Sequence, residues 1–173
     1  MAQQFTGRKL VVIGGSSVIG RQAAADVVAD NGSAVIIGHR PDKVEQAVAE
    51  LSATGAAWGI AADLRDPAEL ERVQARLASE HADASLLVNA VGVFKPLPFL
   101  EHTAADYDSY LELNRAMFFL TQTVARGMVA SGRIGTTTDV AAVITFLSLS
   151  GPAGSQARSG TSTAVSWPDA TSN

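Results

Sequence analysis

The sequence predicts an α/β fold, a doubly wound parallel sheet of about four strands with helices on both faces. Short apolar, β-branched runs alternate with longer segments whose apolar residues recur at helical spacing. The runs are continuous rather than alternating, which is typical of strands buried on both faces of a sheet. Right-handed helical crossovers between such strands give an expected strand order of 3-2-1-4.

The elements follow one another regularly along the chain. Strands are expected at residues 9–14, 34–38, 56–62 and 86–89, and helices at residues 19–30, 41–51, 67–81 and 104–129. Asn31-Gly32 is a natural end for the first helix, and Pro41 suits the first turn of the second. Thr103 with Asp106 three residues later has capping-box spacing, so it marks the start of the longest helix.

The alternation stops after Gly132. Residues 133–137 contain no apolar run for a fifth strand, and the apolar spacing of residues 138–148 predicts another helix instead. The remaining residues, rich in Ser, Thr, Gly, Ala and Pro, are expected to form a disordered tail. We therefore expect a domain over residues 1–133, a late helix within 134–149 and a tail over 150–173.

The composition favours a small-molecule partner. The 173 residues are 47% hydrophobic, enough for one compact domain. A net charge of -4 with scattered basic residues gives no reason to expect nucleic acid or a membrane surface as a partner. The absence of cysteine and the three scattered histidines argue against a metal site. No apolar run reaches the ~18 residues of a membrane helix, so we expect a soluble, cytoplasmic protein.

A glycine-rich loop, Gly14-Gly15-Ser16-Ser17-Val18-Ile19-Gly20, joins the first predicted strand to the first helix. A phosphate would bind at such a turn, because free N–H groups and the positive end of the helix dipole face it. A tight turn that binds no nucleotide is the alternative. Polar residues also follow the other predicted strands, where ligands of parallel sheets bind.

The second strand is followed by His39-Arg40 and by no acidic residue. An acid there suits the ribose 2′-hydroxyl of NAD, whereas an Arg suits the 2′-phosphate of NADP. An Arg that opens a solvated helix is the alternative. Asp63-Leu64 and Asn89-Ala90-Val91-Gly92 follow the third and fourth strands. Taken singly, a helix cap and a strand-ending turn would explain these two segments.

Together these segments resemble the short-chain dehydrogenase/reductase family over residues 7–132. The loop resembles its Gly-x-x-x-Gly-x-Gly pattern, except that Val18 replaces the middle glycine. Since that glycine lets the backbone approach the pyrophosphate, Val18 is expected to crowd the ligand or alter the turn. Asp63-Leu64 resembles the pair whose carboxylate contacts the adenine amino group. Residues 89–92 resemble the Asn-Asn-Ala-Gly motif that lies along the cofactor.

The resemblance implies a Rossmann-like fold that transfers hydride between a nicotinamide cofactor and a carbonyl or alcohol substrate. With Arg40 and no acid, NADP is expected and NAD is less favoured. The residues that the resemblance assigns to the cofactor are Gly14, Ser16, Ser17, Ile19, Gly20, His39, Arg40, Asp63, Leu64, Asn89, Ala90 and Gly92.

Catalytic residues of the family are mostly missing. Asn114 matches the helix Asn of its Ser, Tyr, Lys and Asn tetrad, although a polar residue satisfied by backbone is the alternative. The only tyrosines, Tyr107 and Tyr110, precede Asn114, and the lysines Lys9, Lys43 and Lys95 complete no Tyr-x-x-x-Lys. Since the tyrosine donates the proton in carbonyl reduction, we predict negligible turnover by this chain.

Residues 132–147 resemble a segment near the carboxyl end of the family, as though an internal block were absent. Without a fifth strand, the fourth has an open edge and the long helix loses an apolar partner. The late helix or another copy would cover that surface, and because the long helix is an interface in relatives we expect a homo-oligomer. The alternatives are a catalytically inactive NADP-binding or regulatory module, a remnant without a ligand, and a deleted or misassembled form of an ordinary enzyme.

Overall fold

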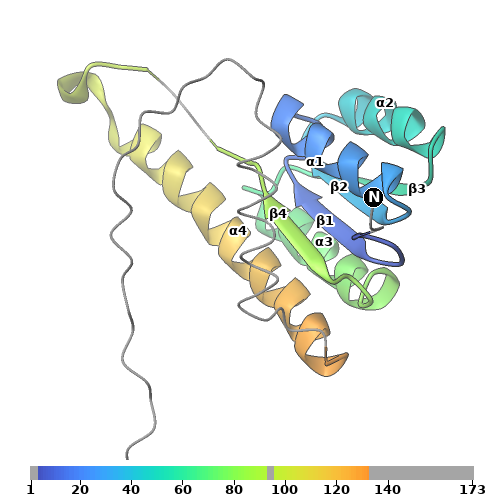
Figure 1. Cartoon of the computed structure of the whole chain (residues 1–173). Helices are drawn as coiled ribbons and strands as arrows, with labels where there is room; N and C mark the ends of the chain where they lie inside the picture. Colours follow the sequence, from blue (N-terminus) through green and yellow to red (C-terminus); the bar gives the residue numbers. More distant parts are fainter. Residues whose placement is uncertain (1–3, 93–95, 133–173) are drawn as a thin grey trace, which may run out of the picture. The chain divides into compact units, whose positions relative to one another are not determined.

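The computed structural model describes residues 4–92 and 96–132, all within the first of the two units into which the chain divides, residues 1–134. Predictions for residues 134–149 and 150–173 lie outside the described residues. The described elements, in chain order, are β1 (Lys9–Ile13), α1 (Val18–Ala29), β2 (Ser33–Gly38), α2 (Pro41–Ser52), β3 (Ala56–Ala61), α3 (Pro67–Glu80), β4 (Leu86–Asn89), the 3-10 helix η1 (Phe99–Glu101) and α4 (Ala104–Ala130) (Figure 1).

The four strands form one parallel sheet in the order β3-β2-β1-β4, which confirms the predicted fold class and strand order. β1 lies between β2 and β4, with Ile13 opposite Ile37 on one side and Asn89 on the other. β3 completes the sheet, with Ala61 opposite Gly38. The carboxyl ends of all four strands therefore meet at one edge of the sheet.

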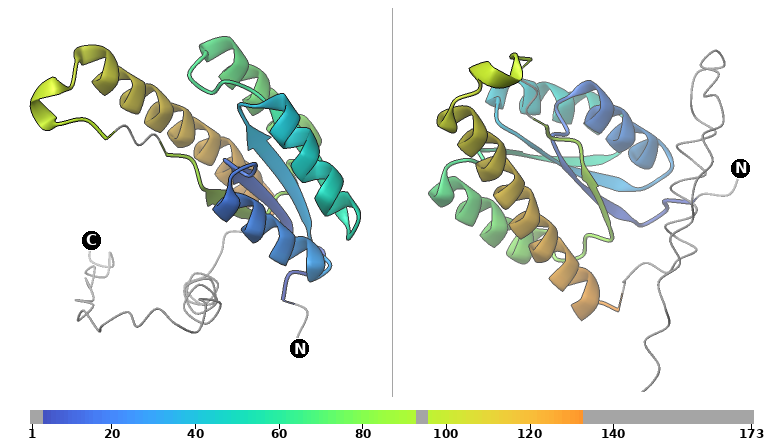
Figure 2. Two further views of the ribbon diagram at one scale, coloured as in Figure 1. Left: turned by 90° about the horizontal axis from the view of Figure 1, so that it is seen from above. Right: turned by 90° about the vertical axis from the view of Figure 1, so that its left-hand side faces the viewer.

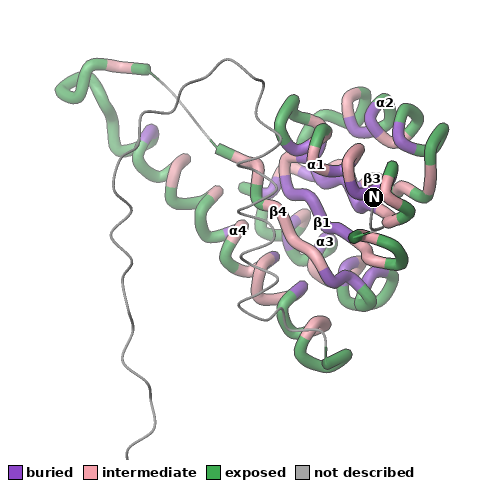
Figure 3. The backbone as a smooth tube through the Cα atoms, viewed as in Figure 1, coloured by how far each residue is buried: buried purple, intermediate pink, exposed green. Residues whose placement is uncertain are grey.

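Helices cover both faces of the sheet, α1 and α2 on one and α3 and α4 on the other (Figure 2). Successive side chains of β1 point to opposite faces, so Leu10 and Val12 pack with the first helix pair and Val11 and Ile13 with the second. β1 and β2 are buried at nearly every position and form the enclosed centre of the unit, whereas β3 and β4, at the edges of the sheet, are mostly only partly buried (Figure 3). Burial on both faces explains why β1 and β2 are apolar over almost their whole length.

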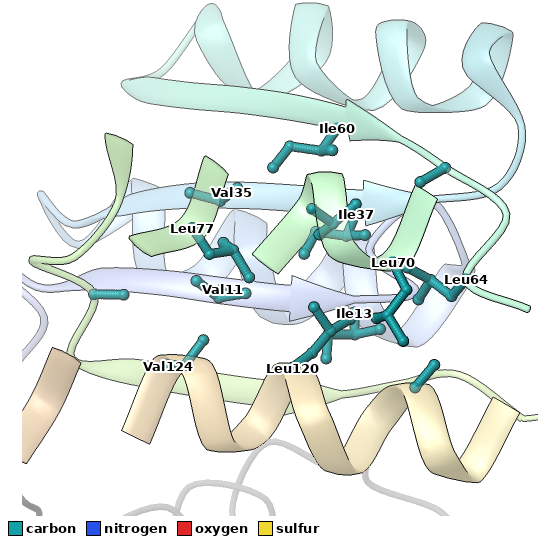
Figure 4. Close-up of a cluster of buried hydrophobic side chains, with 14 residues drawn as sticks. Val11, Ile13, Val35, Ile37, Ile60, Leu64, Leu70, Leu77, Leu120 and Val124 are labelled. Carbon is teal, nitrogen blue, oxygen red and sulfur yellow. The ribbon is translucent and has the colours of Figure 1, made fainter. Parts of the chain in front are cut away.

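The core beneath α3 and α4 shows how helical spacing builds the contact (Figure 4). Leu70, Val73 and Leu77 recur on one face of α3, and all three are buried. From α4, Leu120 and Val124 pack against the same cluster. Core contacts of α4 therefore extend from Leu113 to Met128.

Helix starts agree with the sequence-based expectations, and one alternative is excluded. Thr103 and Asp106 form the predicted capping box of α4. The N-cap of α3 is Asp66, whose carboxylate accepts from the N–H groups of Ala68 and Glu69. Asp63 therefore does not cap that helix.

β1 ends one residue before the predicted limit because Gly14 has a left-handed backbone, with φ of 84°. No described helix is both long enough and apolar enough to cross a bilayer.

One buried polar side chain, His81 at the end of α3, is an exception in this apolar core. It is 4% exposed, and neither ring nitrogen has a hydrogen-bond partner among the described residues. Its ring lies 5.5 Å from that of Trp58, between centroids. Burial, and then the positive charge of Lys9, lower the pKa of this imidazole. The other charged groups that act on it are Glu80, Arg76 and Asp83.

Acidification is expected to destabilise the fold through His81. Because the pKa of His81 is lowered in the folded state, the unfolded chain binds the proton more readily than the folded chain as the pH falls through the unfolded pKa of about 6.5. The free energy of unfolding should therefore fall between pH 7 and pH 5.5, by at most about 1.4 kcal/mol per pH unit from this group. Urea titrations across this range measure the slope.

The matched variants are His81→Phe and His102→Phe. The first removes the buried imidazole and is expected to flatten the slope. The second replaces an exposed histidine and is expected to leave the slope unchanged. An equal pH dependence in His81→Phe and the unmodified chain would contradict the assignment.

Candidate functional site

A pocket of about 370 Å³ opens where the carboxyl ends of the four strands meet. In doubly wound parallel sheets, ligands bind at this edge. The segments after β1, β2, β3 and β4 all contribute to it, and α4 adds one residue. The lining residues are Gly14, Ser16, Ser17, Ile37, Gly38, His39, Arg40, Ala62, Asp63, Leu64, Arg65, Ala90, Val91, Gly92 and Leu113.

The glycine-rich loop delivers the start of α1 to one side of the pocket. Ser17 is the N-cap residue of this helix: its Oγ accepts from the Gly20 N–H at 3.4 Å and donates to the Gly14 carbonyl at 2.6 Å. Val18 and Ile19 occupy the first two helical positions, where backbone N–H groups have no intrahelical acceptor. No acidic residue lies in the first turn. This helix start can therefore receive an anion.

Two glycines allow the segments that border the pocket to pack closely against one another. A Cβ on Gly14 would lie 2.7 Å from Val91 Cγ2 and 2.8 Å from the Ala90 carbonyl oxygen. A Cβ on Gly38 would lie 2.6 Å from Ser16 Oγ. A side chain at either position would therefore push apart two of the segments that line the pocket.

Val18 does not line this pocket. Its side chain is 80% exposed and is not among those that line the pocket. It borders instead a second hollow, between α1 and α2. The expected crowding of a bound pyrophosphate by Val18 stays a prediction.

The end of β2 contributes two basic side chains, His39 and Arg40, both exposed at the pocket. Arg40 is also the N-cap residue of α2, and its side chain makes no capping hydrogen bond. Within residues 4–92 and 96–132 it forms no ion pair. Its guanidinium is thus available to an anionic ligand, although it also opens a solvated helix.

The end of β3 contributes an ion pair that sequence inspection missed. Arg65 Nε lies 2.9 Å from Asp63 Oδ1, and its Nη2 lies 2.7 Å from Oδ2. Hydrogen bonding from the Arg65 guanidinium lowers the pKa of the Asp63 carboxyl. His39, across the pocket, adds a smaller effect in the same direction. The short Asp-x-Arg spacing in a loop was the only signal in the sequence that could have pointed to this pair.

Four of the predicted residues are not pocket-lining. Ile19 is exposed at the start of α1, and Gly20 is buried where a Cβ would lie 2.5 Å from the Gly14 carbonyl. Asn89 donates from Nδ2 to Thr121 Oγ1 at 3.2 Å, which joins β4 to α4. Asn114 is exposed on α4, next to the pocket residue Leu113. The further lining residues that the sequence did not indicate are Ile37, Gly38, Ala62, Arg65, Val91 and Leu113.

Known proteins share this sequence pattern and topology. The family model described as short chain dehydrogenase matches residues 8–156. A sorbitol dehydrogenase of Cereibacter sphaeroides is 30% identical over 133 residues, which cover 76% of this chain and 51% of the relative. A 2,3-dihydro-2,3-dihydroxybenzoate dehydrogenase of Bacillus subtilis is 28% identical over 162 residues, covering 90% and 61%.

A solved structure of a short-chain dehydrogenase also resembles this chain. It is titled as a short-chain dehydrogenase from Sphingobium yanoikuyae in complex with NADPH, and it matches with a TM-score of 0.67 and 27% identity. The match covers 73% of this chain and 50% of that protein. The chain thus spans about half to three fifths of the length of these relatives.

Replacing Gly14 by Ala is expected to destabilise the unit and push the loop after β1 away from the segment after β4. Both Gly14 and Gly7 have left-handed backbones, but a Cβ on Gly7 would meet nothing within 4 Å. Gly7→Ala should therefore lower the free energy of unfolding by about 1 kcal/mol from backbone strain alone. Gly14→Ala should lose about 1–2 kcal/mol more, from contact with Ala90 and Val91. Urea unfolding compares the two, and equal losses would contradict the steric explanation.

Proposed function

We propose, since this chain belongs to the short chain dehydrogenase family, that it binds NADP(H) in the pocket at the strand ends. The observation that carries the proposal is the continuity of this pocket from the start of α1 to the basic end of β2. A dinucleotide bound across such a sheet sets its pyrophosphate against the helix and its adenosine ribose beside the second strand. The pocket supplies a suitable group at both positions.

Each segment has a proposed part in holding the cofactor. The loop residues Gly14, Ser16, Ser17, Ile19 and Gly20 would surround the pyrophosphate, mainly through backbone N–H groups. His39 and Arg40 would face the adenosine ribose, and Asp63 with Leu64 the adenine base. The residues proposed to lie along the rest of the cofactor are Asn89, Ala90 and Gly92.

The preference for NADP over NAD rests on charge. The segment after β2 carries Arg40 and lacks the carboxylate that would accept hydrogen bonds from a 2′-hydroxyl. A guanidinium can bind a 2′-phosphate with two hydrogen bonds. Arg40 forms no ion pair within the described part of the chain, so no intramolecular contact needs to break.

The lineage activity is hydride transfer to a carbonyl or from an alcohol, and the bound nicotinamide supplies the hydride chemistry. Reduction also needs a proton at the substrate oxygen. The 173 residues contain no Tyr-x-x-x-Lys to exchange it, and Asn114 alone matches the family tetrad. We therefore propose that this chain binds the cofactor without appreciable turnover. The expectation of a cytoplasmic location, which came from the sequence, stays a prediction.

Titration with NADPH and NADH tests the cofactor proposal. NADPH should bind, and Arg40→Gln should weaken NADPH about tenfold or more while changing NADH little, because only NADPH carries the 2′-phosphate. Arg126→Gln removes an exposed arginine of α4 outside the pocket and serves as the control. No association of either dinucleotide, or an equal loss for both in Arg40→Gln, would refute the proposal.

We also propose that the chain self-associates through α4. Exposed apolar side chains recur along this helix at intervals of four, seven and eleven residues, which places them on one face. This stripe consists of Tyr107, Leu111, Phe118 and Val129. Exposed apolar side chains that share one helix face mark a protein interaction surface, and a second copy presents the same face.

Sedimentation analysis of Phe118→Glu tests self-association. A buried charge in the centre of the stripe should raise the dimer dissociation constant by at least about tenfold. Phe99→Glu places the same charge on another exposed phenylalanine, in η1 and off the helix, and should leave association unchanged. A monomeric unmodified chain, or equal effects of both variants, would rule out this interface.

A further inference from the structure

The ion pair with Arg65 uses most, but not all, of the hydrogen-bond acceptor sites of the Asp63 carboxylate. Oδ1 accepts two hydrogen bonds, from the Arg65 backbone N–H at 3.1 Å and from Nε at 2.9 Å. Oδ2 accepts one, from Nη2 at 2.7 Å. Each carboxylate oxygen has two lone-pair sites. Among the described residues, Oδ1 is therefore saturated and Oδ2 retains one acceptor site.

A hydrogen bond also fixes the backbone of Asp63. Its N–H donates to Glu69 Oε2 at 2.6 Å, which ties this residue to the first turn of α3. Two parallel hydrogen bonds to a guanidinium then set the carboxylate plane. Asp63 and Arg65 both line the pocket, which makes this oriented carboxylate part of its wall.

We propose that Arg65 is a positioning residue that selects the base of the bound dinucleotide through Asp63. This inference rests on the proposed binding of NADP(H). With one acceptor site left, Asp63 can take one N–H, such as the exocyclic amino group of adenine. Hypoxanthine carries a carbonyl oxygen at the same place, and two acceptors facing each other repel. The pair therefore favours a 6-aminopurine over a 6-oxopurine.

The test compares binding of NADPH with that of its hypoxanthine analogue, deamino-NADPH, by calorimetry. The unmodified chain should bind NADPH about tenfold more tightly, the effect of one hydrogen bond to a charged acceptor. In Arg65→Gln the carboxylate loses its guanidinium partner and can turn and bind water, so the ratio of the affinities for NADPH and deamino-NADPH should fall toward one. Arg65→Lys keeps the charge but cannot bind both carboxylate oxygens, so the preference for NADPH should be mostly lost in this variant too.

Arg76→Gln is the matched control, because Arg76 makes the same Nε and Nη2 contacts to Glu80 on α3, outside the pocket. It should leave the ratio intact. As a second readout, NMR titration of the Asp63 carboxyl should show its pKa rising in Arg65→Gln. This readout does not depend on any ligand.

The outcomes separate the two proposals. If the unmodified chain binds neither dinucleotide, both the proposed function and this inference fail. If it binds NADPH but shows no preference over deamino-NADPH, or if Arg65→Gln or Arg65→Lys keeps the full ratio, only the role of Arg65 is overturned. Loss of the ratio in the Arg65 variants, with Arg76→Gln unchanged, supports it.

Discussion

The parallel hydrogen-bond ladder continues one residue beyond three of the strands, and the pocket depends on these bonds. Gly14 N–H donates to the Ile37 carbonyl at 2.8 Å, and Ala90 N–H donates to the Ile13 carbonyl at 2.8 Å. On the other side, Ala62 N–H donates to the Gly38 carbonyl at 2.9 Å. The loops that line the pocket therefore begin as fixed extensions of the sheet. The neighbouring segments lie so close here that a Cβ on Gly14 or on Gly38, the last residue of β2, would clash with them.

Charge is distributed unevenly around this edge of the sheet. The chain has a net charge of -4, yet His39, Arg40 and Arg65 all lie at the pocket, where Asp63 is the acidic residue in its lining. A local cluster of this sign attracts anions even when the whole molecule is acidic. The net charge of the whole chain therefore carried no information about the charge at the pocket.

The sequence was sufficient to predict the fold and the position of the pocket. Apolar runs such as Leu86 to Asn89 leave a strong local signal, and parallel topology then brings their ends together. Side-chain partnerships leave no such signal. Whether Arg65 turns back to Asp63, or Val18 turns away from the pocket, is decided by loop and helix geometry. The lack of a hydrogen-bond partner for His81 among the described residues likewise depends on packing between elements distant in sequence.

The length of α4 has a mechanical consequence. Its 27 residues extend about 40 Å, whereas the four residues of β4 span about 13 Å. The fully buried residues of α4 are Asp106, Ala116, Leu120 and Val124, and Leu113 and Met128 also pack against the core. Core contact along α4 therefore begins at Leu113, which also lines the pocket. A displacement of the turns that precede Leu113 would reach the pocket wall at this residue first.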